Sequence, residues 1–179
     1  MSSVKILKEN FVDIPRLRLE SEILMNDYSQ GNEQLCLTSV SGNDDWFSGA
    51  GKNTEAEQFN VINKSIQGSY INQLLDLFPN YCRWRLMLLN TKTAYSIHYD
   101  GRENTRNFRI HIPVTSNLMS LMMFFDHSIA TNDVGNARYY RMKEGNIYLF
   151  YASRLHTAMN CSMSEKRLHI VGERNVTRR

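Results

Sequence analysis

The second half of the chain alternates between apolar and polar residues over short stretches. The alternation is strictest in residues 107–114, where Arg109 and His111 share one face and Ile110 and Ile112 share the other. A period of two predicts an extended strand with different chemistry on its two sides. Similar short stretches predict strands at residues 83–90, 95–100, 118–125, 137–142, 146–151, 156–160 and 167–173. Short strands at this close spacing indicate a mainly β fold, either a sandwich or a barrel.

A single helical stripe stands out before these strands. Ile71, Leu74 and Leu75 are spaced as on one side of a helix within residues 68–77, and Pro79 ends the pattern. We expect a short helix there, packed against a sheet. The 179 residues fit one domain, 1–179, in which 1–80 form a helical and loop support region and 81–179 form the β core.

The polar face of residues 107–114 has two interpretations. If Arg109 and His111 point into a barrel, they line a polar pocket, because a buried charge without a partner is unfavourable. If they point to solvent, the apolar face fills the core instead. Alternation alone does not choose between the two.

Composition and charge narrow the class of protein. The formal net charge of +3 is too small for the clustered basic face of a nucleic-acid-binding protein. No apolar run is long enough to cross a membrane. The three cysteines are widely spaced and form no CxxC pair, which favours reduced thiols and a cytoplasmic location.

A histidine and a carboxylate two residues apart form a candidate metal site. In an extended strand, His98 and Asp100 project from the same face, about 6.5–7 Å apart along the chain. His156 lies in a later predicted strand and could supply a third ligand. Two histidines and one carboxylate make the facial triad of non-haem iron(II) oxygenases, although the same ligands also admit manganese, cobalt or zinc.

An arginine after the second histidine adds a candidate anion site. Arg167 follows His156 by eleven residues and opens the last predicted strand, with His169 on the same face. A guanidinium group binds a carboxylate through two parallel hydrogen bonds. A dicarboxylic 2-oxo acid bound to the metal at one end would need such a cation at the other. His169 either lines the pocket or has a structural role.

These elements together resemble the 2-oxoglutarate- and Fe(II)-dependent oxygenase superfamily. More narrowly, the sequence is similar to the branch of aspartyl/asparaginyl β-hydroxylase-like proteins. The similarity covers about the last hundred residues and rests on motifs that occur in the order of the family: HYD at 98–100, RIHIP at 109–113, EG at 144–145, HTAMN at 156–160 and RLHIVGE at 167–173. The first eighty residues carry no assignable motif.

The resemblance implies a fold, a cofactor set and a reaction. The implied fold is a double-stranded β-helix, a jelly-roll or cupin-like barrel with a few flanking helices. His98, Asp100 and His156 would bind Fe(II), and Arg167 would pair with the distal carboxylate of 2-oxoglutarate. With O2, the implied reaction hydroxylates an amino acid, or an amino-acid side chain of a peptide or protein, and releases succinate and CO2.

The resemblance also implies roles around the metal. Arg109 and His111 match the R-x-H strand of the family and would line the pocket near the co-substrate or the substrate. Asn160 matches a polar position with a supporting role. Arg83 and Arg85 lie two residues apart and could meet an anionic substrate, but the favoured interpretation is that they are structural arginines with satisfied partners.

Two other classes use similar ligands. A cupin-type barrel could act as an isomerase, a lyase or a non-catalytic binding module. Arg167 argues against it, since such a protein has no need for a carboxylate clamp. A zinc hydrolase is the third class, and it would need a general base beside the metal that the sequence does not offer.

Overall fold

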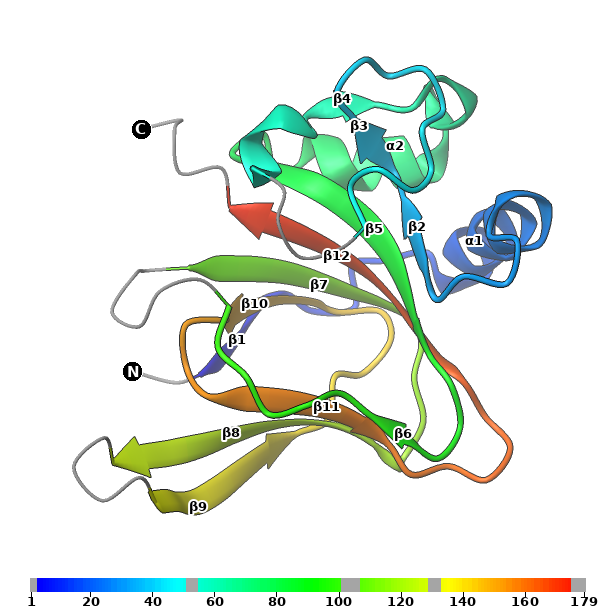
Figure 1. The fold of residues 1–179 in the computed structure, drawn as a ribbon. Helices are drawn as coiled ribbons and strands as arrows, with labels where there is room; N and C mark the ends of the chain where they lie inside the picture. Colours follow the sequence, from blue (N-terminus) through cyan, green and yellow to red (C-terminus); the bar gives the residue numbers. More distant parts are fainter. Residues whose placement is uncertain (1–2, 51–54, 101–106, 129–132, 175–179) are drawn as a thin grey trace.

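Two antiparallel sheets face each other and form a jelly-roll barrel (Figure 1). The computed structural model describes residues 3–50, 55–100, 107–128 and 133–174. The larger sheet has the strand order β1 (Val4–Lys8), β10 (Ile147–Tyr151), β7 (Phe108–Thr115), β12 (Arg167–Arg174), β5 (Tyr81–Leu89) and β2 (Gln34–Cys36). The smaller sheet has the order β6 (Thr93–Ala94), β11 (His156–Asn160), β8 (Ser120–Ser128) and β9 (Asp133–Tyr140). The expected mainly β, jelly-roll class is confirmed.

Two helices cover the outer face of the larger sheet (Figure 1). Helix α1 (Ile14–Tyr28) begins where the Asp13 carboxylate accepts a hydrogen bond from a first-turn N–H, and α2 (Tyr70–Asp76) begins at Ser69 in the same way. Helix α2 lies within the predicted residues 68–77, whereas α1 was not predicted. The remaining short elements are β3 (Thr38–Ser39) paired with β4 (Val61–Ile62), and the 3-10 turns η1 (Ala56–Gln58) and η2 (Lys64–Ile66).

Most predicted strands are present with shifted ends. Residues 156–160 form β11 with the expected bounds, and residues 107–114 lie almost entirely in β7. The prediction of a strand over residues 95–100 is wrong. The two-residue strand β6 ends before this segment, and the segment itself pairs with the smaller sheet at an isolated bridge between His98 and His156.

The central strands β5, β7 and β12 of the larger sheet are mostly buried on both faces. Ile110 and Ile112 are fully buried in the core formed with the helices, while Arg109 and His111 point to the opposite side, into the barrel. Of the two interpretations of this strand, the structure therefore has the first: the polar face lines a cavity inside the barrel. The apolar face packs into a separate core beneath the helices.

The first eighty residues contribute β1 and β2 to the larger sheet. Whether they form a distinct support region remains a prediction. None of the helices in the described part of the chain is long and apolar enough to cross a membrane. The three cysteines are all free thiols.

Candidate metal centre

The three predicted metal ligands converge at one end of the barrel. His98 and His156 face each other across the bridge, with reciprocal backbone hydrogen bonds of 3.0 and 2.9 Å. The Asp100 N–H donates to the carbonyl of Ala152 at 3.0 Å, which brings the carboxylate beside both rings. One ligand atom from each of the three side chains lies within 4.8 Å of the other two.

Both imidazole rings present the same nitrogen to this point. Nδ1 of His98 lies 2.6 Å from the carbonyl oxygen of Ser96, and Nδ1 of His156 lies 2.7 Å from that of Arg154. A carbonyl accepts only from a protonated ring nitrogen, so Nε2 is left as the electron-pair donor. Such contacts fix the orientation of metal-binding histidines.

The Asp100 carboxylate completes a donor set that fits a metal ion. Its oxygens lie 3.6 Å from Nε2 of His98 and 3.5 Å from Nε2 of His156. Atoms bonded to one ion at about 2.1 Å lie about 3–4 Å apart, so these spacings suit joint coordination. Burial alone would raise the pKa of Asp100, but His156, Arg109 and His98 outweigh it and lower that pKa to about 2. The carboxylate is therefore ionised at neutral pH.

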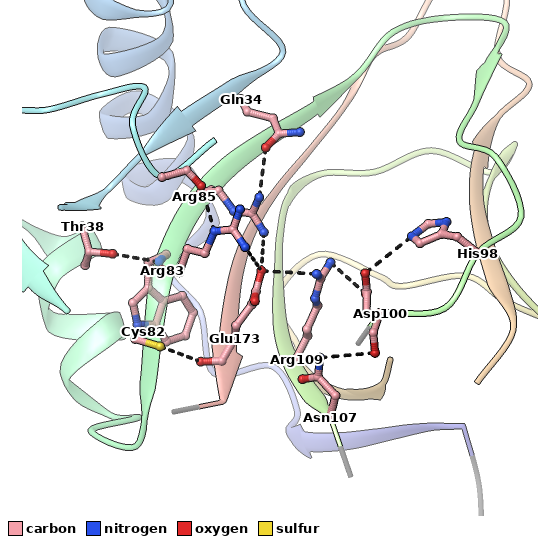
Figure 2. Close-up of polar contacts among 12 residues, drawn as sticks. Gln34, Thr38, Cys82, Arg83, Arg85, His98, Asp100, Asn107, Arg109 and Glu173 are labelled. Carbon is pink, nitrogen blue, oxygen red and sulfur yellow. Dashed lines mark hydrogen bonds and ion pairs between the residues drawn. The ribbon is translucent and has the colours of Figure 1, made fainter. Parts of the chain in front are cut away.

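Arg109 connects this centre to a second carboxylate. One terminal nitrogen, Nη1, lies 3.0 Å from Oδ2 of Asp100, and Nη2 donates to Oε1 of Glu173 at 3.2 Å (Figure 2). Sequence reasoning placed Arg109 in the pocket but missed Glu173. Glu173 lies on the same face of β12 as Arg167, at even spacing, which was the available signal.

Arg167 is buried deep in the barrel wall. Its Nε donates to Nε2 of His169 at 3.1 Å, and its Nη2 lies 3.4 Å from the sulfur of Met122. Within the described residues it has no carboxylate partner. Burial lowers the pKa of Arg167 to about 10, with a small opposing effect from Tyr95, so the side chain is still a cation at neutral pH.

Two buried histidines accompany this arginine. His111 and His169 lie with their Nδ1 atoms 3.5 Å apart, and burial followed by the charge of Arg167 keeps the pKa of each well below the usual range. Both rings are therefore neutral at pH 7. His111 lines the cavity, whereas His169 lies behind Arg167 and contacts it, which supports the structural interpretation of His169.

One cavity of about 720 Å³ joins these groups. The three predicted metal ligands and Arg109, His111 and Arg167 all line it. Arg83 and Arg85 also line it, and both contact Glu173. Asn160 lies outside the cavity lining. Its fully buried amide donates to the carbonyls of Leu89, Asn90 and Glu165, in agreement with a supporting role.

Comparison with known proteins identifies relatives only at the level of structure. No protein-family model matches the sequence, and no curated protein matches it. Among solved structures, HygX from Streptomyces hygroscopicus, with nickel and 2-oxoglutarate bound, gives a TM-score of 0.61 at 7% identity, covering 96% of this chain and 82% of its own. AviO1 from Streptomyces viridochromogenes Tue57 gives 0.59 at 12% identity, covering 96% and 88%.

A viral enzyme has the same fold. The collagen prolyl hydroxylase of Paramecium Bursaria Chlorella virus-1 gives a TM-score of 0.57 at 10% identity, covering 98% of this chain and 90% of its own. A further structure of that hydroxylase is a complex with 2-oxoglutarate. The chain thus has the double-stranded β-helix fold of 2-oxoglutarate-dependent non-haem iron hydroxylases, together with a His-Asp-His cluster suited to a metal.

Proposed function

We propose that this protein is a 2-oxoglutarate- and Fe(II)-dependent dioxygenase. It hydroxylates an amino acid, or an amino-acid side chain of a peptide or protein, and releases succinate and CO2. One observation carries the proposal: a His-Asp-His cluster and a buried arginine without a carboxylate partner among the described residues line the same cavity. A metal and a dicarboxylic acid are the ligands that these two features fit.

In this proposal each residue has a distinct part. His98, Asp100 and His156 hold Fe(II), which supplies the activation of O2 when bound. Arg167 binds the distal carboxylate of 2-oxoglutarate through its guanidinium group, which is charged at neutral pH. Its desolvated position strengthens that ion pair, because few waters compete for the cation.

The surrounding side chains orient these groups. Arg109 approaches Oδ2 of Asp100, the same oxygen that lies 3.5 Å from Nε2 of His156, and this contact limits the rotation of the carboxylate. His111 stays neutral and so adds no positive charge between Arg109 and Arg167. Phe150 packs 4.8 Å from the ring of His156, measured between centroids, and keeps water from that side of the centre.

Two finer assignments rest on the sequence and on the cysteines. The motifs of the second half favour the aspartyl/asparaginyl β-hydroxylase-like branch, and we propose a small molecule or a peptide segment as substrate. The three free cysteines favour a cytoplasmic location, which likewise remains a proposal.

Succinate formation tests the proposal. Purified protein is incubated in air with Fe(II) and 2-oxoglutarate, alone and with pools of free amino acids and peptides, and succinate is measured by mass spectrometry. We expect succinate from the wild type and none from His156→Ala. Arg138→Gln is the matched surface control, since Arg138 pairs with Asp126 on exposed side chains. Metal binding without any use of 2-oxoglutarate would instead favour the cupin-type alternative.

A further inference from the structure

Three arginines surround a single glutamate in the cavity wall. Glu173 Oε1 accepts from Nη2 of Arg85 at 2.7 Å, from Nη2 of Arg109 at 3.2 Å and from Nη1 of Arg83 at 3.3 Å (Figure 2). We call Arg83, Arg85 and Arg109 the arginine cluster. All three line the cavity that holds the metal centre, and none of the proposed roles of iron or 2-oxoglutarate requires Arg83 or Arg85.

The backbone holds the cluster in an unusual way. Arg83 adopts a φ of 49°, in the left-handed region that a residue with a side chain rarely occupies. At this point β5 is irregular against β12, and the Trp84 ring lies where a side chain on Gly172 would be. Bulges of this kind re-aim side chains beside functional sites. The Nε of Arg83 donates to the carbonyl of Gly49 at 2.8 Å, which fixes the side chain further.

The cluster carries more positive charge than the cavity neutralises. Four arginines line the cavity, but among the described residues only Asp100 and Glu173 line it as carboxylates. Asp100 pairs with Arg109 but would also be shared with the metal, so among these lining residues Glu173 is the one carboxylate that serves the cluster alone. Gln34, which accepts from Arg85 at 3.0 Å, is neutral. Burial, together with the neighbouring arginines and against Glu173, lowers the pKa of Arg85 to about 10.

Two N–H groups of the cluster also lack a hydrogen-bond acceptor among the described residues. The Nε atoms of Arg85 and Arg109 are buried and have no hydrogen-bond acceptor among the described residues. A guanidinium group is stable in a desolvated wall when its charge is met by anions. The shortage of acceptors therefore lies at Arg85 and Arg109, whose terminal nitrogens contact Gln34, Asp100 and Glu173 while their Nε atoms have no acceptor in the described part of the chain.

The arginine cluster lies next to the candidate metal centre. Arg109 touches both Asp100 of the metal centre and Glu173 of the cluster, so an anion at the cluster lies one side chain away from the metal. Arg167 makes none of these contacts; its neighbours are Met122 and His169. The cavity therefore has two separate cationic groups, one of which is not needed for a dicarboxylic co-substrate.

We propose that the arginine cluster binds an oxyanion group of the primary substrate, a carboxylate or a phosphate. The cluster would anchor the substrate by this group and leave the remainder of the molecule beside the metal centre. The inference rests on the proposed function for the identity of the reaction. It extends that function by restricting the substrate to anionic molecules, and it makes Glu173 a positioning residue that holds the three guanidinium groups together.

Binding of simple anions tests this inference apart from turnover. The protein is loaded with Ni(II) and saturating 2-oxoglutarate, and is titrated at constant ionic strength with inorganic phosphate, acetate or acetamide. Calorimetry gives the affinity, and the melting temperature gives a second readout, since a ligand of the folded state raises it with concentration. We expect phosphate or acetate to bind and acetamide not to bind, and the tighter of the two anions identifies the group.

Variants assign the binding to the cluster. Arg85→Gln should weaken the anion affinity at least tenfold, Arg85→Lys should recover part of it, and Arg138→Gln should leave it unchanged because Arg138 is exposed on β9. Equal binding of acetate and acetamide, or wild-type affinity in Arg85→Gln, overturns the inference. So does a rise in the 2-oxoglutarate requirement of Arg85→Gln, which would place the co-substrate at the cluster.

The two proposals fail in different ways. If the wild type forms no succinate but the anion binds through Arg85 in the absence of 2-oxoglutarate, the proposed reaction is wrong and the anion site stands. If succinate forms equally well with anionic compounds and with their neutral amides, the reaction stands and the anion site is wrong.

Discussion

The substitution Arg167→Met is expected to weaken the binding of 2-oxoglutarate without lowering the stability of the fold. The Arg167 guanidinium is buried without a carboxylate partner among the described residues, and its pKa is lowered to about 10. At about 1.4 kcal/mol per unit, this lowering corresponds to a penalty of about 3 kcal/mol on the charged form. Methionine has a similar length and no charge, so it removes the penalty and keeps most of the packing.

The free energy of unfolding and the affinity for 2-oxoglutarate should not fall together in this variant. Without ligand, the free energy of unfolding should stay the same or rise by about 1–3 kcal/mol, because a desolvated cation is replaced by an apolar group. With ligand, the affinity for 2-oxoglutarate should fall by at least about 2 kcal/mol, or about thirtyfold, because a buried charged hydrogen-bond pair is lost. Urea denaturation measures the first quantity, and calorimetric titration of the Ni(II)-loaded protein measures the second.

Two results would refute this reasoning. An affinity for 2-oxoglutarate within threefold of the wild type would show that Arg167 is not the carboxylate clamp. A loss of more than about 2 kcal/mol of stability in the ligand-free variant would show that His169 and Met122 already compensate the charge. Arg138→Met, on the exposed pair with Asp126, controls for the loss of one positive charge.

Three further substitutions test separate parts of the structure. Asp100→Ala should weaken metal affinity at least about a hundredfold, since even outer-shell changes cost about 10–100-fold; equal affinity by metal titration would exclude it as a ligand. Gly172→Ala should destabilise the fold by about 1–3 kcal/mol in urea, because a Cβ there would lie 2.5 Å from the Trp84 ring; an unchanged midpoint would contradict this. Asn160→Ala should lower stability by about 2–4 kcal/mol by leaving buried carbonyls unpaired, with the 2-oxoglutarate affinity unchanged; the opposite pattern would place Asn160 in the site.

The convergence of His98, Asp100 and His156 was predictable because two of the three residues are neighbours on one short segment. His98 and Asp100 are two residues apart, and β11 carries His156 at its first position. The route by which they meet was not predictable in detail. His98 pairs with His156 at an isolated bridge rather than in a long strand, and bridges of this kind depend on loop geometry that residue alternation does not encode.

The role of Glu173 could not be predicted because its partners lie on two other strands. Arg83 and Arg85 belong to β5 and Arg109 to β7, and these strands meet β12 in a register that the sequence alone does not specify. The irregularity at Arg83 adds to the difficulty, since it breaks the alternation by which shared faces are recognised. The favoured prediction that Arg83 and Arg85 are structural arginines with satisfied partners stays a prediction; both contact Glu173.

Helix α1 escaped prediction for a different reason. Only Leu17, Ser21 and Leu24 are buried, and one of these is polar, while Leu19 and Ile23 are exposed. A polar residue therefore lies on the buried face of the helix, and apolar residues lie on its exposed face. As a result, the sequence does not show the spacing of apolar residues by which a helix is recognised.

The most direct test of the central claim is the spectrum of the iron complex. Anaerobic addition of Fe(II) and 2-oxoglutarate to the protein should give a weak visible charge-transfer band that neither component gives alone. The band should be absent from Asp100→Ala, and in Arg167→Met it should appear only at higher 2-oxoglutarate concentration. No band from the folded wild type at saturating Fe(II) and 2-oxoglutarate, together with no succinate in air, would contradict the assignment of this cavity as a 2-oxoglutarate oxygenase site.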